Sequence, residues 1–356
     1  MGGEHIGIGI IGTGFGAKVQ LPGFALLPSA RVMGIASSDG ARAASLAREH
    51  ALPVAPSSWR ELLEHPDVHL VSVAVRPALQ EEVVRSALDA GKHVLCEKPF
   101  TLGALQAERL LLEARRAGVV HAVDLEFRAL RTLQALRERL AGGLDGALRS
   151  IRFEWNVGTW ADPSLPWRWQ CDRSECGGVL SAIGVHLFDM AEWICGPAES
   201  VKAALRTAIR ERPGSDGKLL AVTAEDTADL ELRMRSGLTV WIATSNVDPS
   251  GAGLVITAEC ERATLTLDGG TQRYGSALCL QRGDEVLLRE EPVAGDPRVG
   301  LFAAAVSPLV AAIAHGTTYE GPSFHEGVRI QRIREGAIRS SQTADWVDIP
   351  EPEAIE

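Results

Sequence analysis

Lys98 is the side chain in this sequence whose position best suits proton transfer. It stands two residues beyond the short apolar run 93–96, which predicts a buried strand. Ligands of open α/β sheets bind beyond the carboxyl ends of the strands, and a partly desolvated lysine there can hold a substrate hydroxyl and carry its proton. An ordinary surface lysine fits the spacing equally well.

His186 is a second candidate for acid–base chemistry, because the ordinary pKa of an imidazole lies close to neutral pH. It stands in the glycine-rich segment 177–189, within an expected helix over 184–193. A histidine that merely packs on that helix is the alternative. Asp189 follows three residues later, and on a helix its carboxylate serves packing or capping as readily as chemistry.

A turn of sequence Gly-Thr-Gly-Phe-Gly-Ala at residues 12–17 follows the apolar run 7–11 and opens an expected helix. Gly12 would permit a tight turn, Gly14 would let the backbone approach a pyrophosphate, and Ala17 is small enough for close helix–strand packing. The N-terminus of a helix attracts phosphate. The turn therefore predicts a dinucleotide site. The candidate residues for binding this dinucleotide are Gly12, Gly14, Phe15, Gly16, Ala17, Val75, Glu97 and Lys98.

The end of the second expected strand bears on which dinucleotide is bound. An acidic residue about 20 positions beyond the glycine turn binds the ribose hydroxyls of NAD and repels the 2′-phosphate of NADP. Ser37 and Ser38 stand at that place, with Arg42 one helical turn away. They could bind a phosphate, or they could only cap the helix that begins near Asp39. We expect NADP or NAD, with a weak preference for NADP.

A tryptophan-rich segment over 160–170 precedes the histidine segment. The ring of Trp167 could stack on a sugar, and Arg168 could bind hydroxyls or a carboxylate; a loop anchored by buried indoles explains the composition equally well. Arg128 and Arg173 are further candidates for contact with a substrate.

The first third of the chain alternates strand-like and helical patterns, which is typical of a doubly wound parallel sheet covered on both faces. The strands are expected at 6–11, 31–36, 68–75, 93–96 and 119–123, and the helices at 15–27, 41–50, 59–65, 78–90 and 102–117. We therefore expect a dinucleotide-binding Rossmann domain over residues 1–125.

The rest of the chain has a different order of elements, because strand patterns follow one another with few helices between them. Strands are expected at 150–157, 200–210, 227–235, 238–245, 253–259, 263–267 and 285–290, with helices at 130–140, 184–193, 301–314 and 326–340. An open, mainly antiparallel sheet with helices on one face follows. We assign residues 126–356 to a second α/β domain for substrate binding, with the C-terminal helices packing back.

Composition excludes several classes of function. The net charge of −10 argues against general binding to nucleic acid or to an anionic membrane. The N-terminus lacks the basic region of a signal peptide and no stretch reads as a membrane span, so we expect a cytoplasmic protein. The six cysteines have no repeated spacing, and a zinc site from Cys171, Cys176, His186 and Cys195 is disfavoured; no metal is expected.

Three ordered segments resemble the Gfo/Idh/MocA oxidoreductases, the family of glucose-fructose oxidoreductase and inositol dehydrogenase. Residues 90–99 resemble A-G-K-H-V-L-x-E-K-P, residues 177–189 resemble G-G-x-L-x-D-x-G-x-H-x-x-D, and residues 322–327 match P-x-F-x-(D/E)-G. The resemblance covers nearly the whole chain.

The resemblance implies that Lys98 is the active-site lysine and that His186 faces the substrate near the nicotinamide. It also implies pairing of subunits through the second sheet into a homodimer or homotetramer. The chain departs from the family at two positions, since Ala182 replaces the aspartate before the histidine and Gln80 replaces a common histidine. Asp124 and Glu126 could supply the missing carboxylate from another strand end.

These observations predict an NAD(P)-dependent oxidoreductase that transfers hydride between the nicotinamide and a secondary alcohol or ketone of a sugar, sugar derivative or cyclitol. Lys98 and His186 are the expected catalytic residues. The substrate contacts are expected from Lys98, Arg128, Trp167, Arg168, His186 and Asp189. A non-catalytic NAD(P)-binding sensor and an NAD-dependent glycosidase are the alternatives on the same fold.

Overall fold

The computed structural model describes residues 5–269, 277–291 and 294–352. The chain divides into two compact units. Unit 1 comprises Met1–Ala129, Asp296–Val328 and Pro352–Glu356; unit 2 comprises Leu130–Gly295 and Arg329–Glu351.

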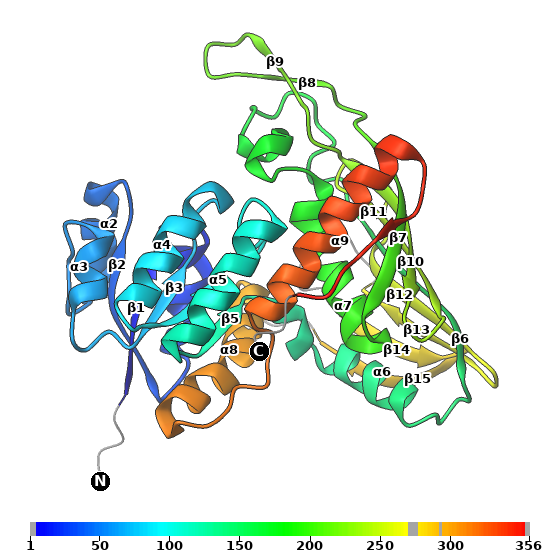
Figure 1. Cartoon of the computed structure of the whole chain (residues 1–356), viewed down its shortest axis with the longest axis horizontal. Helices are drawn as coiled ribbons and strands as arrows, with labels where there is room; N and C mark the ends of the chain where they lie inside the picture. Colours follow the sequence, from blue (N-terminus) through cyan, green and yellow to red (C-terminus); the bar gives the residue numbers. More distant parts are fainter. Residues whose placement is uncertain (1–4, 270–276, 292–293, 353–356) are drawn as a thin grey trace. The chain divides into compact units, whose positions relative to one another are not determined.

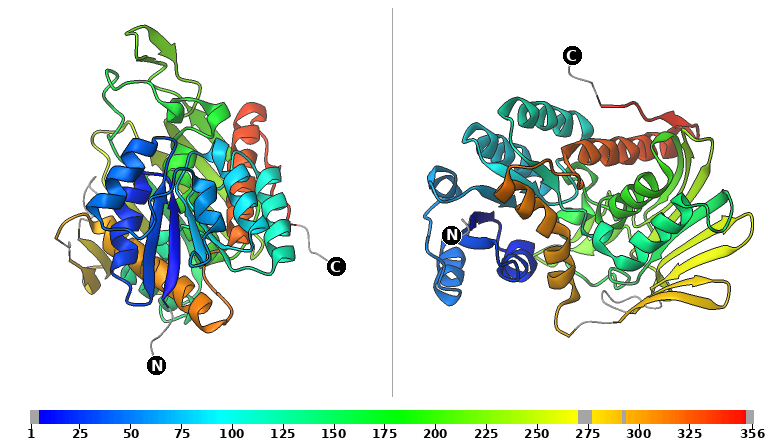
Figure 2. Two further views of the ribbon diagram at one scale, coloured as in Figure 1. Left: turned by 90° about the vertical axis from the view of Figure 1, so that its left-hand side faces the viewer. Right: turned by 90° about the horizontal axis from the view of Figure 1, so that it is seen from below.

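Unit 1 contains a five-stranded sheet in the order β2-β1-β3-β4-β5, and every neighbouring pair is parallel. Its strands are β1 (Ile6–Ile11), β2 (Ala30–Ala36), β3 (Leu70–Val73), β4 (His93–Cys96) and β5 (His121–Val123). The strand order reverses between β1 and β3, which is where ligands bind in such sheets. The left view of Figure 2 shows the strands side by side with helices on both faces.

The connections in unit 1 are helical (Figure 1). They are a π-helical turn at Gly16–Gln20, then α1 (Leu21–Ala25), α2 (Gly40–Glu49), α3 (Trp59–Glu64), α4 (Pro77–Asp89) and α5 (Ala104–Ala117). A short 3-10 turn at Glu126–Ala129 follows β5. The expected single helix over 15–27 is thus two pieces, because the first turn after the glycines is wound more widely.

Alternate side chains of β1 serve opposite faces of the sheet. Ile8 and Ile10 point into a buried apolar cluster on one face. On the other face Gly9 leaves room for Leu62 of α3, whose Cβ would lie 3.5 Å from a Cβ placed on Gly9. Small residues on this face therefore bring the covering helix close to the sheet.

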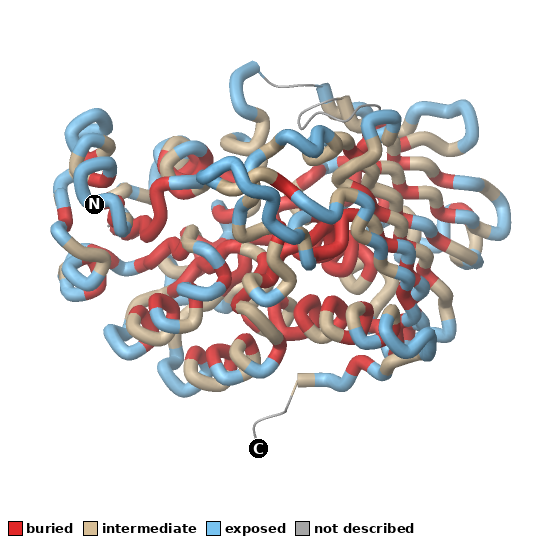
Figure 3. Tube along the Cα trace, turned by 90° about the horizontal axis from the view of Figure 1, so that it is seen from above, coloured by how far each residue is buried: buried red, intermediate tan, exposed pale blue. Residues whose placement is uncertain are grey.

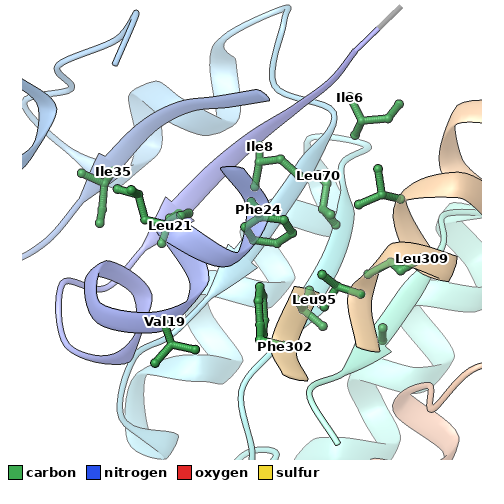
Figure 4. Packing of buried hydrophobic residues seen from close by; sticks show 14 residues of the cluster. Ile6, Ile8, Val19, Leu21, Phe24, Ile35, Leu70, Leu95, Phe302 and Leu309 are labelled. Atoms are coloured by element: carbon green, nitrogen blue, oxygen red, sulfur yellow. The ribbon is translucent and has the colours of Figure 1, made fainter. Parts of the chain in front are cut away.

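The apolar cluster of unit 1 includes a helix from far along the chain, α8 (Pro297–His315). Phe302 of α8 meets Phe24 of α1 edge to face, with ring centroids 5.0 Å apart (Figure 4). We expected residues 126–356 to form a second domain whose C-terminal helices pack back, and the structure groups residues 296–328, which include α8, with unit 1. The physical reason is that Phe302 and Leu309 complete the core beneath β1.

Unit 2 contains a nine-stranded sheet in the order β15-β14-β13-β12-β6-β11-β10-β7-β16. Only the β6–β11 pair is parallel among the described pairs. The strands are β6 (Leu148–Asn156), β7 (Ala198–Arg206), β10 (Thr227–Met234), β11 (Thr239–Ser245), β12 (Gly253–Cys260), β13 (Thr264–Asp268), β14 (Leu278–Arg282), β15 (Glu285–Glu290) and β16 (Val347–Asp348). Buried and exposed residues alternate along β10, as Figure 3 shows for this sheet. One face is therefore core and the other is solvated.

Three helices contribute to unit 2: α6 (Arg131–Ala141), α7 (Val185–Cys195), and the larger part of α9 (Phe324–Thr343). Short 3-10 turns lie at Trp169–Cys171 and Arg173–Glu175, and a π-helical turn at Leu180–Gly184 runs directly into α7. A separate hairpin, β8 (Glu211–Pro213) and β9 (Leu219–Ala221), extends from this unit (Figure 1).

The predicted fold class is confirmed in both units. The sequence patterns missed four short strands, β8, β9, β14 and β16, because runs of two to five residues carry little periodicity. We expected no membrane span, yet Arg173–Cys195 and Pro297–His315 are long and apolar enough by length and composition. Buried side chains such as Phe188 and Phe302 belong to a packed core, which accounts for that apolar character.

Candidate functional site

The glycine turn lies at the carboxyl end of β1, at the reversal of strand order in unit 1. Gly12 has φ +123° and donates its N–H to the carbonyl of Ala36 (2.8 Å). A Cβ on Gly12 would lie 2.2 Å from the carbonyl oxygen of Ala74, just beyond β3. Only glycine fits here, because both the backbone angle and the neighbouring strand exclude a side chain.

Gly14 differs from Gly12, since a Cβ there would meet nothing within 4 Å. The first turn of the following helix has no acidic residue and no side-chain cap. The space beside Gly14 is therefore open, at a helix start of the kind that binds a pyrophosphate in dinucleotide-binding folds. The residues present fit the predicted cofactor.

The closest approach of this helix to the sheet is at Gly16, where a Cβ would lie 2.8 Å from Cγ2 of Ile10. Ala17, to which we assigned close packing, is half-buried and packs against the apolar cluster that includes Ile8 and Ile10 of β1. Gly16 and Ala17 therefore both lie on the packed side of this π-helical turn. Phe15 is half-buried beside the guanidinium of Arg298.

The end of β2 is tied to the glycine turn by polar contacts. Thr13 Oγ1 donates to Ser37 Oγ (3.1 Å), and Arg42 Nη2 donates to the carbonyl of Thr13 (3.0 Å). Asp39 caps α2 by accepting from the backbone N–H of Arg42. The capping interpretation is therefore correct for Asp39, whereas Arg42 directs its guanidinium toward the turn. Ser38 is exposed at the same edge.

Lys98 is half-buried beyond the end of β4, at the carboxyl edge that also carries the glycine turn. The preceding Glu97 is buried and accepts a hydrogen bond from Gln20 Nε2 (2.8 Å). Gln20 in turn accepts from Ser72 Oγ (2.8 Å). This chain of bonds links the end of the π-helical turn to β3 and β4, so it fixes the backbone from which Lys98 extends.

Gln80, which replaces a histidine common in the family, binds backbone groups through its side-chain amide. Its Nε2 donates to the carbonyl of Glu97 (3.0 Å) and more weakly to that of Val75 (3.4 Å). Its Oε1 accepts from the backbone N–H of Thr101 (2.6 Å). Gln80 therefore holds the chain on both sides of Lys98, and half-buried Val75 lies at the same edge.

Two further carboxyl groups lie beside Glu97. Asp124 follows β5 and Glu126 opens the next turn, and both are buried. Burial, together with the charge of Glu126, raises the pKa of Glu97 to about 7. Burial and the neighbouring Glu97 and Glu126 raise the pKa of Asp124 well above its ordinary value. At neutral pH this group of acids retains a proton.

The third sequence motif, residues 322–327, supports the same edge structurally. Glu326 accepts from Ser323 through its backbone N–H (2.7 Å) and its hydroxyl (2.8 Å), which caps α9. Burial raises the pKa of Glu326, but hydrogen bonds from His325 and Ser323 and the charge of Arg128 outweigh it and bring the pKa to about 2. Arg128 is therefore a partner of Glu326; its predicted contact with a substrate stays a prediction.

His186 belongs to unit 2, where it is buried on the first turn of α7. Its ring centroid lies 6.1 Å from that of Trp155 on β6. Asp189 is buried one helical turn later. Ala182 is exposed on the preceding π-helical turn, so the position of the family's aspartate is open to solvent.

Glu225, which the sequence analysis missed, organises the glycine segment before His186. Its carboxylate accepts from the backbone N–H of Leu180 (3.2 Å) and its carbonyl accepts from Val179 (2.8 Å). Gly178, with φ +97°, packs against it so closely that a Cβ would lie 2.2 Å from Glu225 Oε1. Burial raises the pKa of Glu225, although the nearby guanidinium of Arg334 opposes this.

The tryptophan-rich segment is anchored to the β8–β9 hairpin. The indole N–H of Trp167 donates to the carbonyl of Ala221 (3.0 Å). The guanidinium of Arg212 lies over the ring of Trp160 and binds two carbonyls of the segment. Trp167 is therefore an anchor, as one alternative held, while Arg168 is exposed and its contact with a substrate stays a prediction.

Among the described residues, no group of three or more His, Cys, Asp or Glu side chains is arranged to hold a metal ion. Cys176 lies against Ser181 (3.5 Å) and accepts from Gln331 (3.7 Å). The arrangement within each unit thus provides a dinucleotide turn with a lysine in unit 1, and a buried histidine in unit 2.

Comparison with known families assigns both halves of the chain. Residues 6–125 match the NAD-binding Rossmann-fold domain of the GFO/IDH/MocA oxidoreductase family, and residues 133–266 match a C-terminal domain of the same family. The chain belongs to this family. It is therefore an NAD-binding oxidoreductase of the dehydrogenase or reductase kind, and the predicted resemblance is confirmed.

Two curated relatives match nearly the whole of this oxidoreductase. An uncharacterized oxidoreductase of Synechocystis sp. is 31% identical, covering 98% of this chain and 97% of that protein. Levoglucosan dehydrogenase of Pseudarthrobacter phenanthrenivorans is 26% identical, covering 98% and 99%.

Solved structures share the fold. An oxidoreductase domain protein from Kribbella flavida is 27% identical with a TM-score of 0.86, covering 98% of this chain and 100% of that chain. A levoglucosan dehydrogenase in complex with NADH and L-sorbose has a TM-score of 0.89 at 24% identity, with the same coverage.

Proposed function

We propose that this oxidoreductase transfers hydride reversibly between a nicotinamide cofactor and a secondary alcohol or ketone of a sugar, sugar derivative or cyclitol. The observation that carries the proposal is Lys98, half-buried at the carboxyl edge of the parallel sheet, on a segment fixed by Glu97, Gln20 and Gln80. The same edge carries the glycine turn, whose open space at Gly14 fits a dinucleotide.

In this proposal Lys98 binds the reacting hydroxyl and holds or releases its proton, and His186 assists. When bound, the nicotinamide would supply the hydride acceptor or donor. Lys98 suits the role because its surroundings are partly desolvated and carry carboxyl groups that stabilise an ammonium.

The test is Lys98→Ala, with exposed Lys202→Ala on β7 as the matched control. We expect turnover to fall by about 10²- to 10⁴-fold while cofactor affinity changes little, because a positioned proton carrier contributes about that much. A Lys98→Ala variant that binds cofactor and keeps full turnover would overturn the assignment.

We also propose a preference for NADP. Ser37, Ser38 and the guanidinium of Arg42 line the end of β2, and the carboxylate of Asp39 is held as the cap of α2. Titration of intrinsic fluorescence with NADPH and NADH tests this. Arg42→Ala should weaken NADPH binding by about tenfold, about 1.4 kcal/mol, and leave NADH unchanged. A wild-type preference for NADH of tenfold would refute it.

A sugar or cyclitol substrate is supported by relatives whose names state such activities. Levoglucosan dehydrogenase is one, and a 1,5-anhydro-D-fructose reductase of Ensifer adhaerens, 31% identical over 59% of this chain and 63% of that protein, is another. A panel of sugars and cyclitols followed at the nicotinamide absorbance tests the class. Binding of NAD(P) without turnover across the panel would favour a sensor. Release of free sugar with no net change in cofactor absorbance would favour a glycosidase.

For the assembly, we propose a homodimer or homotetramer formed through the sheet of unit 2, whose solvated face carries charged residues such as Glu231 and Arg233 on β10. A cytoplasmic location without nucleic-acid or membrane partners accompanies it. Light scattering on the purified protein tests the assembly, and a monomer at micromolar concentration would contradict it.

A further inference from the structure

The carboxyl groups of Glu97 and Asp124 are brought together by the pairing of two strands. β4 and β5 run parallel with Cys96 opposite Val123, so the next residue of each strand lies at the same edge. The backbone N–H of Asp124 donates to the carbonyl of Cys96 (2.8 Å), and the two side-chain carboxyls lie against each other. Adjacent strand ends thus place two acids in contact.

Both acids are buried, with 8% of Glu97 and 2% of Asp124 exposed. Glu97 accepts from Gln20, whereas neither carboxyl oxygen of Asp124 receives a hydrogen bond from an N–H group or a hydroxyl of the described residues. Two ionised carboxylates in such a place would repel each other, and Asp124 would lack any donor. A protonated Asp124 would instead donate to Glu97, which satisfies both groups.

We infer that Glu97 and Asp124 hold one proton between them and so present one negative charge, not two, to Lys98. The pair acts as a positioning device, because it sets the charge beside the lysine without contacting the reacting atoms. The inference rests on the proposed function for the role of Lys98 in proton transfer, but the shared proton itself does not.

The charged and titratable groups that face the pair come from two elements. They are Cys96 and Lys98 on the β4 segment and Glu126 on the following 3-10 turn. The other contacts, from Gln20 and Gln80, are neutral amides. Burial and the nearby acids raise the pKa of the Cys96 thiol well above its ordinary value, so it stays neutral. The raised pKa values of the pair agree with a retained proton.

Conservative substitutions separate a shared proton from two independent charges. In Asp124→Asn the amide replaces the protonated acid as donor to Glu97; in Glu97→Gln, Asp124 is free to ionise. Either single variant therefore keeps one negative charge, and only the double variant removes it. The ionisation of Lys98 is read from the rate of its modification by acetic anhydride across pH, measured by peptide mass spectrometry.

We expect the rate of Lys98 acetylation at pH 8 to change less than about threefold in each single variant and to rise about tenfold or more in the double variant. The limb of the pH profile of kcat/KM that belongs to Lys98 should move likewise. Equal, additive shifts in the single variants would mean two independent charges and overturn the inference. No shift in any variant would also overturn it, by showing a structural role alone.

Infrared spectroscopy of the folded wild-type protein tests the proton directly and does not depend on whether the double variant folds. At pH 8, above the pKa of about 7 of Glu97, we expect a carboxylic-acid C=O band that is lost in Asp124→Asn. Absence of that difference would refute the shared proton. If the band and the lysine shifts are found but no substrate turns over, the proposed function fails while the inference stands.

Discussion

The two units each contain a glycine segment that runs into a π-helical turn. The two segments differ in what lies at the start of the turn. In unit 1 the turn at Gly16–Gln20 follows Gly12, and the space beside Gly14 is open. In unit 2 the turn at Leu180–Gly184 follows Gly178, and Glu225 accepts from the N–H of Leu180.

The difference shows how the same local geometry serves two purposes. A helix N-terminus carries partial positive charge and unsatisfied N–H groups, so it needs an anion or an acceptor. In unit 2 the acceptor is the carboxylate of the buried Glu225, which binds the N–H of Leu180, so we call this segment closed. In unit 1 the described residues provide no side-chain cap and no acidic residue in the first turn, so this segment is suited to an external phosphate. Gly12 and Gly178 look alike in sequence, but one frames a ligand site and the other a structural support for His186.

The largest expected effect is on catalysis, from substitution of His186, the residue that follows the closed segment of unit 2. His186→Ala should lower kcat by about 10²-fold or more if the histidine assists proton transfer. Cofactor affinity should stay unchanged, because His186 is expected to act on the substrate and is not among the residues proposed to bind the dinucleotide. Steady-state kinetics with exposed His315→Ala as control measures this. Full activity of His186→Ala would reduce the histidine to a packing role.

Alanine substitutions at Gly14 in unit 1 and Gly178 in unit 2 test the open and the closed segment directly. Gly178→Ala should destabilise the protein by about 1–3 kcal/mol, since the φ of +97° and the contact with Glu225 both exclude a Cβ. Gly14→Ala should leave the unfolding temperature unchanged and weaken NAD(P) binding by about tenfold or more, because it fills the open space. Thermal unfolding and fluorescence titration measure the two effects. Reversal of this pattern would contradict the assignment of the ligand site to unit 1.

Restoring the family's carboxylate should have a smaller effect. Ala182 is exposed, so Ala182→Asp is accommodated without repacking, and a carboxylate near His186 favours the imidazolium. The limb of the pH profile that belongs to His186 should move to higher pH by up to about one unit, whereas the neutral control Ala182→Asn leaves it in place. An unchanged profile would show that the π-helical turn directs position 182 away from the histidine.

The smallest expected effect is on stability against pH in unit 1. Glu97 has a folded-state pKa of about 7, above its ordinary 4.5, so the stability it contributes is fully present below pH 4.5 and is lost as pH rises through 7. The unfolding temperature of wild type should therefore fall more steeply between pH 5 and 8 than that of Glu97→Gln. Identical slopes in the two proteins would argue against a raised pKa.

Much of unit 1 could be predicted because its signals are local. The alternation of strands and helices, the glycine turn and Lys98 beyond β4 each depend on a few neighbouring residues. The roles within those segments were harder to assign. Gly16 packs within 2.8 Å of Ile10 Cγ2 when a Cβ is placed on it, a restriction that arises in a π-helical turn which a short sequence does not reveal.

The candidate site also depends on residues that no spacing rule identifies. Gln20 reaches Glu97 across 77 residues and Leu180 reaches Glu225 across 45. A glutamine in a helix and a glutamate before a strand are ordinary in sequence. A buried acid that pairs with a distant backbone can be recognised only when the chain is folded.

By itself, the sequence determined the family, the parallel and antiparallel sheets, and the glycine, lysine and histidine segments, because these follow from short-range patterns of apolarity and backbone freedom. Only the tertiary structure decided that α8 completes the core of unit 1, that Glu97 and Asp124 meet, and that Glu225 closes the segment before His186. Those outcomes arise from burial and hydrogen-bond satisfaction between residues far apart in the chain, which local patterns do not specify.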